Sequence, residues 1–157
     1  MKLKQSEDGK FVFEMGKRER ALLQEVLRYY PLIPVSHHTL TRVPDPGVDP
    51  GDQKLLEEAM AARKLEQKGR VGKLLEDQQR FVPRGTGYRV TFSREEMEWL
   101  LQVLNDVRVG SWLALGCPDP DAGKAPEVDE SNGKYMFLME LSGHFEWILL
   151  EALDGTG

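Results

Sequence analysis

The chain has 157 residues, of which 40% are hydrophobic and 30% charged, and its formal net charge is −5 at pH 7. This length and composition predict one soluble globular domain, residues 1–157, with a real core, and the acidic balance argues against a general binder of the phosphate backbone. The single cysteine excludes an internal disulfide. The chain starts with polar residues and has no apolar run near the ~20 residues of a membrane span. We therefore expect a cytoplasmic protein without a membrane segment.

The beginning of the chain predicts a β-hairpin followed by a helix. Residues 2–4 and 10–15 are the expected strands, and the turn between them ends at Gly9, which can take a positive φ. Apolar and polar side chains alternate in the second strand, so one of its faces should be buried. The helix is expected over about residues 17–30, because Pro31 disfavours a helical conformation in the residue before it.

A proline-rich connection, residues 31–51, comes next and contains five prolines and two glycines. A structureless loop of this length is uncommon in a compact domain, so we expect it to be functional or mobile. Asp52 is the expected cap of a helix over about residues 53–79. Gly69 and Gly72 each cost about 1 kcal/mol relative to alanine, which predicts a kink or break there. The first half of this helix carries an apolar stripe that predicts burial: Leu55, Leu56, Ala59, Met60, Ala62 and Leu65.

A second hairpin and helix follow this long helix. Residues 80–82 and 88–92 are the expected strands, and a glycine-containing turn separates them. Ser93 and Glu96 form a capping box, which is a specific start signal. The helix that begins there is expected to run over about residues 94–115.

The two hairpin-plus-helix segments are similar in sequence. Residues 10–27 align without a gap with residues 87–104, strand on strand and helix on helix, which indicates a possible internal duplication. A pseudo-twofold axis would then bring the strands of both halves together. An acidic, proline-containing loop that we expect to be mobile occupies residues 117–131, and a last helix covers about 133–153. The predicted fold class is α+β and mostly helical, with two β-hairpin-plus-helix units and additional long helices.

The second half of helix 94–115 is apolar or small on every side. A helix without a polar face is usually buried all round, so we expect residues 109–115 to be enclosed. Gly110 and Ser111 would let another backbone approach closely.

Polar side chains stand immediately before this apolar segment. Asn105, Asp106 and Arg108 need partners if they lie at the edge of a buried region. One interpretation is an internal network, in which Arg108 clamps a carboxylate and Asp106 holds a neighbouring backbone or an arginine. The other is a docking surface or small-ligand pocket with Trp99 or Trp112 as its wall. A catalytic role is disfavoured, because one carboxylate and one arginine lack a nucleophile and an evident base.

The same run carries a resemblance to a known family. The pattern is a tryptophan, then leucine-asparagine-aspartate, a hydrophobic residue and an arginine, matched here by Trp99, Leu104, Asn105, Asp106 and Arg108. It resembles the uncharacterised bacterial family called domain of unknown function 2017, most clearly over residues 90–153. The family has no established activity, so the resemblance implies no reaction. Some members are described as transcriptional regulators, and others lie near genes for a Clp-protease adaptor, which implies a regulatory role and a protein partner.

Two further groups of residues suggest other functions. Glu140 and His144, four residues apart, could join Asp106 in a small metal-dependent hydrolase, but three histidines and one cysteine give no complete ligand spacing. The adjacent histidines His37 and His38 would diverge in an extended chain and are a poor metal site. A basic cluster on the 53–79 helix could bind nucleic acid, although glutamates are interspersed and no aromatic residue accompanies it. Its members are Arg63, Lys64, Lys68, Arg70 and Lys73.

The sequence therefore predicts a non-catalytic regulatory or accessory protein that acts by binding another protein. The expected binding residues are Trp99, Asn105, Asp106 and Arg108. We expect no cofactor and no metal, and a homodimer is possible. The alternatives are a nucleic-acid-binding transcriptional regulator and, less favoured, the small metal-dependent hydrolase.

Overall fold

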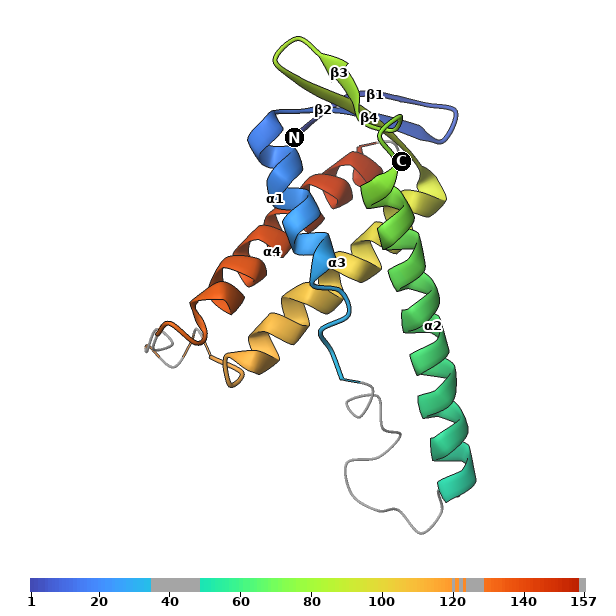
Figure 1. Ribbon diagram of the computed structural model, residues 1–157, viewed down its shortest axis with the longest axis vertical. Helices are drawn as coiled ribbons and strands as arrows, with labels where there is room; N and C mark the ends of the chain where they lie inside the picture. Colours follow the sequence, from blue (N-terminus) through green and yellow to red (C-terminus); the bar gives the residue numbers. More distant parts are fainter. Residues whose placement is uncertain (35–48, 120, 122, 124–128, 156–157) are drawn as a thin grey trace.

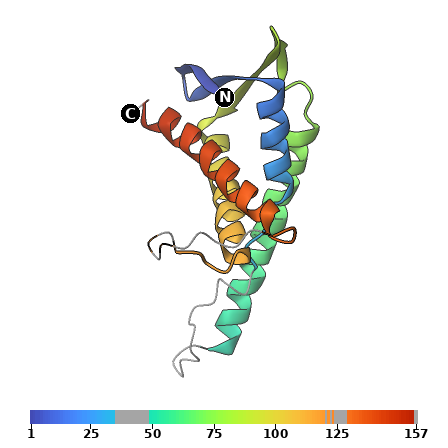
Figure 2. The same ribbon diagram turned by 90° about the vertical axis from the view of Figure 1, so that its left-hand side faces the viewer.

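The computed structural model describes residues 1–34, 49–119, 121, 123 and 129–155. A four-stranded antiparallel sheet lies across one end of a layer of helices (Figures 1 and 2). The elements in chain order are β1 (Lys2–Glu7), β2 (Lys10–Met15), α1 (Lys17–Arg28), α2 (Pro50–Glu76), β3 (Val82–Arg84), β4 (Gly87–Ser93), α3 (Arg94–Ala114) and α4 (Gly133–Asp154). The predicted α+β, mostly helical class with two hairpin-plus-helix units is confirmed.

The sheet joins the two hairpins through their second strands. The strand order is β1-β2-β4-β3, so each hairpin contributes one central and one edge strand. Phe13 pairs with Val90 at the centre, and these two positions are also equivalent in the sequence alignment of the two halves. The register is therefore symmetric about this pair, as the predicted pseudo-twofold axis requires. Phe11, Phe13, Val90 and Phe92 are buried on the face that the helices cover.

Both units start their helix with a glutamate at the third helical position. In the second unit Ser93 Oγ accepts a hydrogen bond from the Glu96 N–H (3.1 Å), and Glu96 Oε2 accepts one from the Ser93 N–H (2.9 Å). In the first unit Glu19 accepts from the Gly16 N–H (3.1 Å). Each glutamate also forms an ion pair with a cation that precedes its own hairpin. Glu96 pairs with the Arg80 guanidinium at 2.8 Å, and Glu19 pairs with the amino terminus. The predicted capping box is confirmed, and it has a partial equivalent in the other half.

The helices pack unequally on one another. α3 packs most extensively against α4, and α1 contacts both of them. The segment that leaves α1 crosses α3 at Gly110, where an added Cβ would lie 2.4 Å from the Leu32 Cβ and 3.0 Å from the Leu32 carbonyl carbon. The predicted close approach of a backbone at Gly110 is confirmed.

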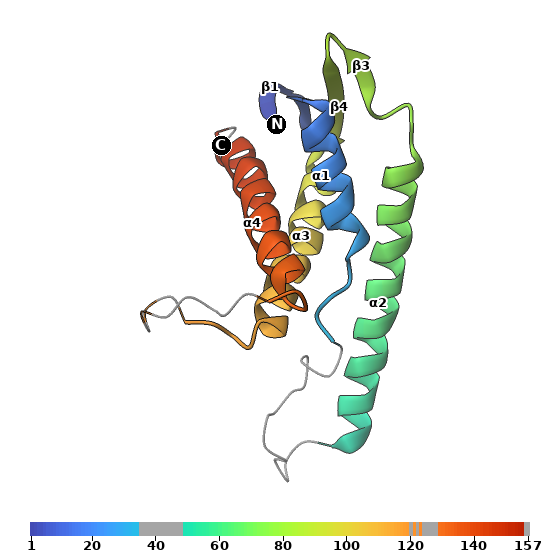
Figure 3. The same ribbon diagram turned by 60° about the vertical axis from the view of Figure 1, so that its left-hand side comes forward.

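The prediction for α2 was wrong in three respects. Its cap is Asp49, whose side chain accepts from the Gly51 N–H at 2.9 Å, and the helix is continuous through Gly69 and Gly72. Its first half projects beyond the ends of the other helices (Figures 1 and 3). The expected buried stripe is largely exposed, with Leu55 and Leu65 at 65% and 73% exposure. The buried residues are instead Lys64, Val71 and Leu74, which face α1 and α3.

The end of α3 is also less enclosed than predicted. Gly110 and Ser111 are buried, but Trp112 is 38% exposed and Ala114 is exposed. The indole N–H of Trp112 donates to the Pro118 carbonyl at 3.0 Å. The mistake has a simple cause: apolar residues on all sides of a helix permit burial all round but do not supply enough neighbours to cover every side.

Some sequence predictions fall outside the described residues. These are most of the proline-rich connection, with His37 and His38, and part of the acidic loop over 117–131. Within the described part of the chain, none of the helices combines the length and apolarity that a membrane crossing requires.

Candidate functional site

The four predicted binding residues lie on α3 but do not form one site. Trp99 and Asp106, seven residues apart, are buried on the side that faces α2. Arg108 lies on the side that faces α4 and is partly exposed. Asn105 lies between these two sides and is exposed. Arg108 is two positions after Asp106, which is about 200° around a helix, so their side chains lie in different environments.

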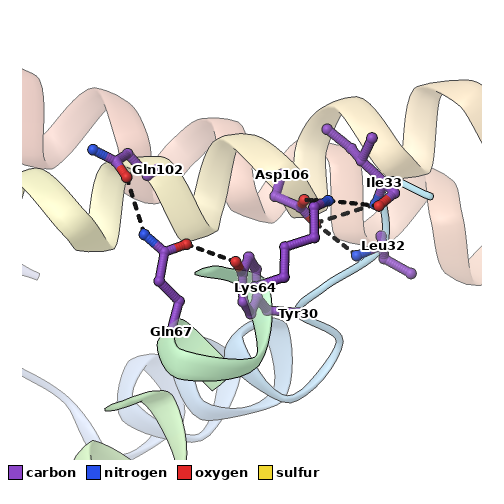
Figure 4. A network of polar contacts seen from close by, with 7 residues as sticks. All are labelled: Tyr30, Leu32, Ile33, Lys64, Gln67, Gln102 and Asp106. Carbon is purple, nitrogen blue, oxygen red and sulfur yellow. Dashed lines mark hydrogen bonds and ion pairs between the residues drawn. The ribbon is translucent and has the colours of Figure 1, made fainter. Parts of the chain in front are cut away.

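Asp106 is the centre of a buried polar network (Figure 4). Its Oδ1 accepts hydrogen bonds from the backbone N–H groups of Leu32 (2.6 Å) and Ile33 (3.3 Å). Its Oδ2 forms an ion pair with Lys64 Nζ at 3.0 Å. Lys64 also donates to the Ile33 carbonyl at 2.6 Å. The carboxylate thus ties α2 and the segment after α1 to α3.

A second chain of hydrogen bonds lies beside this network, between the end of α1, α2 and α3. The Tyr30 hydroxyl donates to Gln67 Oε1 at 2.6 Å, and Gln67 Nε2 donates to Gln102 Oε1 at 3.0 Å (Figure 4). Arg63 donates to the same Gln102 oxygen at 2.9 Å. Burial, with a smaller contribution from the negative charge of Asp106, raises the pKa of Tyr30 to about 12. Tyr30 is therefore a neutral hydrogen-bond donor at any physiological pH.

A groove between α2 and α3, which we call the α2–α3 groove, runs past this network. One hollow of about 280 Å³ lies beside Lys64 and Asp106, and another of about 340 Å³ lies beside Trp99 and Arg80. A third, of about 240 Å³, shares residues with both and connects them. Charges along the groove have partners within the protein: Arg70 pairs with Glu66 and Glu95, and Arg80 pairs with Asp77 and Glu96. The groove is hollow and most of its charged groups pair with one another, but the buried Arg80 Nε has no hydrogen-bond partner among the described residues.

Arg108 belongs to a different surface, formed by α3 and α4. Its Nε forms an ion pair with Glu146 at 3.0 Å, and its Nη2 donates to Asn105 Oδ1 at 2.8 Å. Burial raises the pKa of the Glu146 carboxyl, and the nearby Arg108 charge opposes that rise. An added Cβ on Gly143 would lie 3.6 Å from the Arg108 Cδ, so this part of α4 lies directly beside Arg108.

The neighbours of this ion pair are largely apolar. Residues spaced by four, three and four positions share one side of a helix, and this spacing holds on both helices around the pair. We call the surface the α3–α4 face; it comprises Leu101, Asn105, Arg108, Trp112, Met139, Gly143, Glu146 and Leu150. Trp147 adjoins it, on the side of α4 that also carries the exposed Glu140, His144 and Glu151. Trp147 is 60% exposed and Leu150 is 46% exposed. Exposed tryptophan beside a partly buried ion pair is chemistry suited to binding another macromolecule.

The residues of the predicted metal-dependent hydrolase are not brought together. Asp106 is enclosed on the α2 side of α3, whereas Glu140 and His144 are exposed on α4. Among the described residues, no group of three histidine, cysteine or acidic side chains could hold a metal ion. The basic cluster on α2 is also less available than its sequence indicates, because Lys64 is buried on Asp106 and Arg70 is paired with two glutamates.

Lys64 is the main residue that sequence reasoning missed. It was assigned to a solvated basic cluster, although it lies inside. A signal was present: Met60, Lys64, Gln67, Val71 and Leu74 recur every four or three residues, which is the spacing of one helix face. Two polar residues in that stripe obscured it.

Comparison with known proteins adds no identification. No protein-family model, curated protein or solved structure matches the chain. The resemblance of the segment around Trp99 to Arg108 to domain of unknown function 2017 is neither confirmed nor refuted and stays a prediction.

Proposed function

We propose that this protein is a non-catalytic regulatory or accessory factor of the cytoplasm that binds another protein through the α3–α4 face. The observation that carries the proposal is the group of exposed apolar side chains around the Arg108–Glu146 pair, with Trp112, Trp147 and Leu150 at 38%, 60% and 46% exposure. Large apolar side chains that are exposed beside polar groups are typical of interaction sites.

The residue types favour protein recognition over binding of a small molecule. Tryptophan and arginine are enriched among the residues that dominate protein interfaces, and each aromatic side chain can bury ~150–250 Å². The Arg108 Nε and one Nη already have partners on the protein. Asn105 and Arg108 therefore remain in the proposed site, whereas Asp106 and Trp99 are buried on the side of α3 that faces α2 and lie outside it.

A photo-reactive amino acid at position 147 tests this proposal. We expect light-dependent covalent capture of a polypeptide by the protein carrying the probe at Trp147, with the attached peptide identified by mass spectrometry. The matched control carries the same probe at Leu65, which is 73% exposed on α2, away from the α3–α4 face. If position 147 yields no polypeptide adduct beyond the yield at position 65, the proposal is wrong.

A second candidate, nucleic-acid binding, has one observation in its favour. The exposed side of the sheet gathers cations around a single carboxylate, since Glu14 lies 3.1 Å from Arg89, 3.2 Å from Arg84 and 3.5 Å from Lys4. The hydrogen bond from Arg89 and the charge of Lys4 hold the pKa of Glu14 below its ordinary value. This site is locally basic in an otherwise acidic protein and could attract phosphate groups.

Fluorescence anisotropy with a labelled single-stranded DNA separates this candidate from the first. If the sheet binds phosphates, Glu14→Gln should tighten binding, because it leaves three cations without their carboxylate, and Arg84→Ala should weaken it. Lys68→Ala removes the same charge from α2 and serves as the control. Equal affinities for all of these variants would discard the sheet as a nucleic-acid site.

A further inference from the structure

We infer that the hollow beside Lys64 and Asp106 is a binding site for a small molecule that carries one carboxylate and a short apolar tail. We call it the Lys64 hollow; it lies between Lys64 on α2, Asp106 on α3 and Ile33 in the segment that leaves α1. It opens on the α2 side of α3, away from Arg108, so it goes beyond the proposed function and is tested separately.

The floor of the Lys64 hollow consists of buried polar groups in fixed positions. Tyr30, Lys64 and Asp106 are 4%, 8% and 7% exposed, and all three line the hollow. Tyr30 bonds to Gln67, while Lys64 and Asp106 bond to each other and to the segment after α1 (Figure 4). Little conformational entropy is therefore lost when a ligand binds to them. The volume of about 280 Å³ is at the lower end for ligand sites, so a small molecule fits it.

The lining has more hydrogen-bond donors than its own acceptors use. The Lys64 ammonium has three protons, of which two go to the Asp106 carboxylate and a backbone carbonyl. The Gln102 oxygen already accepts from Gln67 and Arg63, but the Gln102 amide nitrogen, which points away from Gln67 in Figure 4, donates to no described residue. Within the described part of the chain, the Arg63 guanidinium donates only to Gln102. A ligand that complements this lining supplies acceptors.

The charge of the lining favours an anion. Arg63 and Lys64 contribute two positive charges and Asp106 one negative charge, which leaves one positive charge. The Asp106 carboxylate is largely compensated, because it accepts from two backbone N–H groups and pairs with Lys64. Arg63 is exposed at the rim and has no ion pair with a described residue. Its planar guanidinium can therefore bind a carboxylate through two parallel hydrogen bonds.

One wall of the hollow is apolar and selects among anions. Ile33 and Met60 line it and are partly exposed. A tail of a few carbons would cover both side chains, and methionine adapts its shape easily to such a neighbour. Inorganic phosphate would leave both side chains in water. A small aliphatic monocarboxylate is therefore the class of ligand that fits both the charge and the wall.

Titration with hexanoate tests the inference on the full chain labelled with nitrogen-15. The side-chain amide signals of Gln102 and Asn105, which line the hollow, should shift and saturate in nuclear magnetic resonance spectra. For a molecule of this size we expect a dissociation constant of ~1 mM. Hexanamide, its uncharged counterpart, and inorganic phosphate should each bind at least ~10-fold more weakly, because one lacks the charge and the other lacks the tail.

Variants of the rim keep the test independent of the buried ion pair. Gln102→Glu retains an acceptor for Gln67 and Arg63 but replaces the amide donor with a negative charge, so it should weaken hexanoate binding at least ~10-fold. The titration is then followed by the Asn105 signal, and circular dichroism checks the fold. Arg63→Gln should weaken binding to a similar extent. Lys68→Gln removes the same charge from an exposed position of α2 outside the hollow and should leave the affinity unchanged.

Three results would overturn the inference. The first is the absence of a saturable shift up to ~20 mM hexanoate, a range that covers weak binding. The second is equal affinity for hexanoate and either hexanamide or phosphate, because the charge or the apolar wall would then not contribute. The third is undiminished affinity in both Gln102→Glu and Arg63→Gln, which would place the bound hexanoate elsewhere. None of these results bears on cross-linking at position 147, so the proposed function stands or fails separately.

Discussion

The helix of the first hairpin-plus-helix unit stops at Arg28, whereas that of the second continues beyond the equivalent position, Asn105, to Ala114. The extension begins at Asp106, which holds the backbone of Leu32 and Ile33 where the chain leaves α1. The part of α3 without a counterpart in α1 therefore fixes the route of the first unit's exit and also presents Arg108 and Trp112 to the α3–α4 face. The equivalent parts build the sheet and core, and the unequal part carries the candidate site.

The largest effect is expected from removing the Asp106 carboxylate. Asp106→Ala leaves Lys64 buried without its ion partner and two backbone N–H groups without acceptors, and breaking a buried pair in this way costs ~3–5 kcal/mol. Urea unfolding followed by circular dichroism measures the loss. Asp106→Asn keeps one acceptor oxygen and should lose less, and Asp154→Ala, at an exposed position, should stay within about 0.5 kcal/mol of the wild type. A loss below ~1 kcal/mol for Asp106→Ala would show that the extension does not anchor the exit of α1.

A methyl group at Gly110 probes the same contact by crowding. Its Cβ would lie 2.4 Å from the Leu32 Cβ and 3.1 Å from the Ile33 nitrogen, and that segment is held by Asp106, so it cannot easily withdraw. We expect Gly110→Ala to cost ~1–3 kcal/mol. Gly69→Ala is the matched control on α2, where nothing lies within 4 Å of the added Cβ. It should stabilise by up to ~1 kcal/mol through helix propensity, so thermal unfolding should move the two variants in opposite directions.

Tyr30 gives a smaller effect with a distinct pH dependence. Its pKa is raised to about 12, above the ~10 of an unfolded chain, so the folded protein binds this proton more tightly. The resulting stabilisation is complete below pH ~10 and is lost as the pH rises through ~12. Absorbance titration of tyrosinate should show one late-titrating group that Tyr30→Phe removes and Tyr29→Phe keeps. Tyr30→Phe should also cost ~1 kcal/mol at neutral pH through the lost hydrogen bond to Gln67.

The smallest effect on folding is expected from Arg108. Its side chain is 44% exposed beside Glu146, and exposed ion pairs contribute about 0–1 kcal/mol. Arg108→Ala should therefore lower the unfolding free energy of the subunit by less than ~1 kcal/mol while weakening binding at the α3–α4 face. Urea unfolding measures the first quantity, and the yield of cross-linked product with the probe at position 147 measures the second. A loss as large as that of Asp106→Ala would mean that both sides of α3 belong to one structural network.

The candidate site could be read from the sequence only in part. The polar run after Leu104 singled out Asn105, Asp106 and Arg108, and the internal-network interpretation holds for two of them: Asp106 holds a neighbouring backbone, and Arg108 clamps a carboxylate. The docking-surface interpretation stays a prediction. The sequence did not show which residues would pair with them. Lys64, Leu32 and Glu146 lie 42, 74 and 38 positions from the residues they bind, and no local pattern encodes such pairings.

The sequence by itself determined the local elements, because capping, alternation and turn chemistry act over a few residues: Ser93 with Glu96 starts α3, and alternating apolar residues form β2 and β4. The alignment of the two halves also anticipated the symmetric centre of the sheet. Only the tertiary structure decided which side of each helix is covered. Leu55 and Leu65 are exposed while Lys64 is buried, because burial depends on which neighbours reach a surface and not on the polarity of the residue alone.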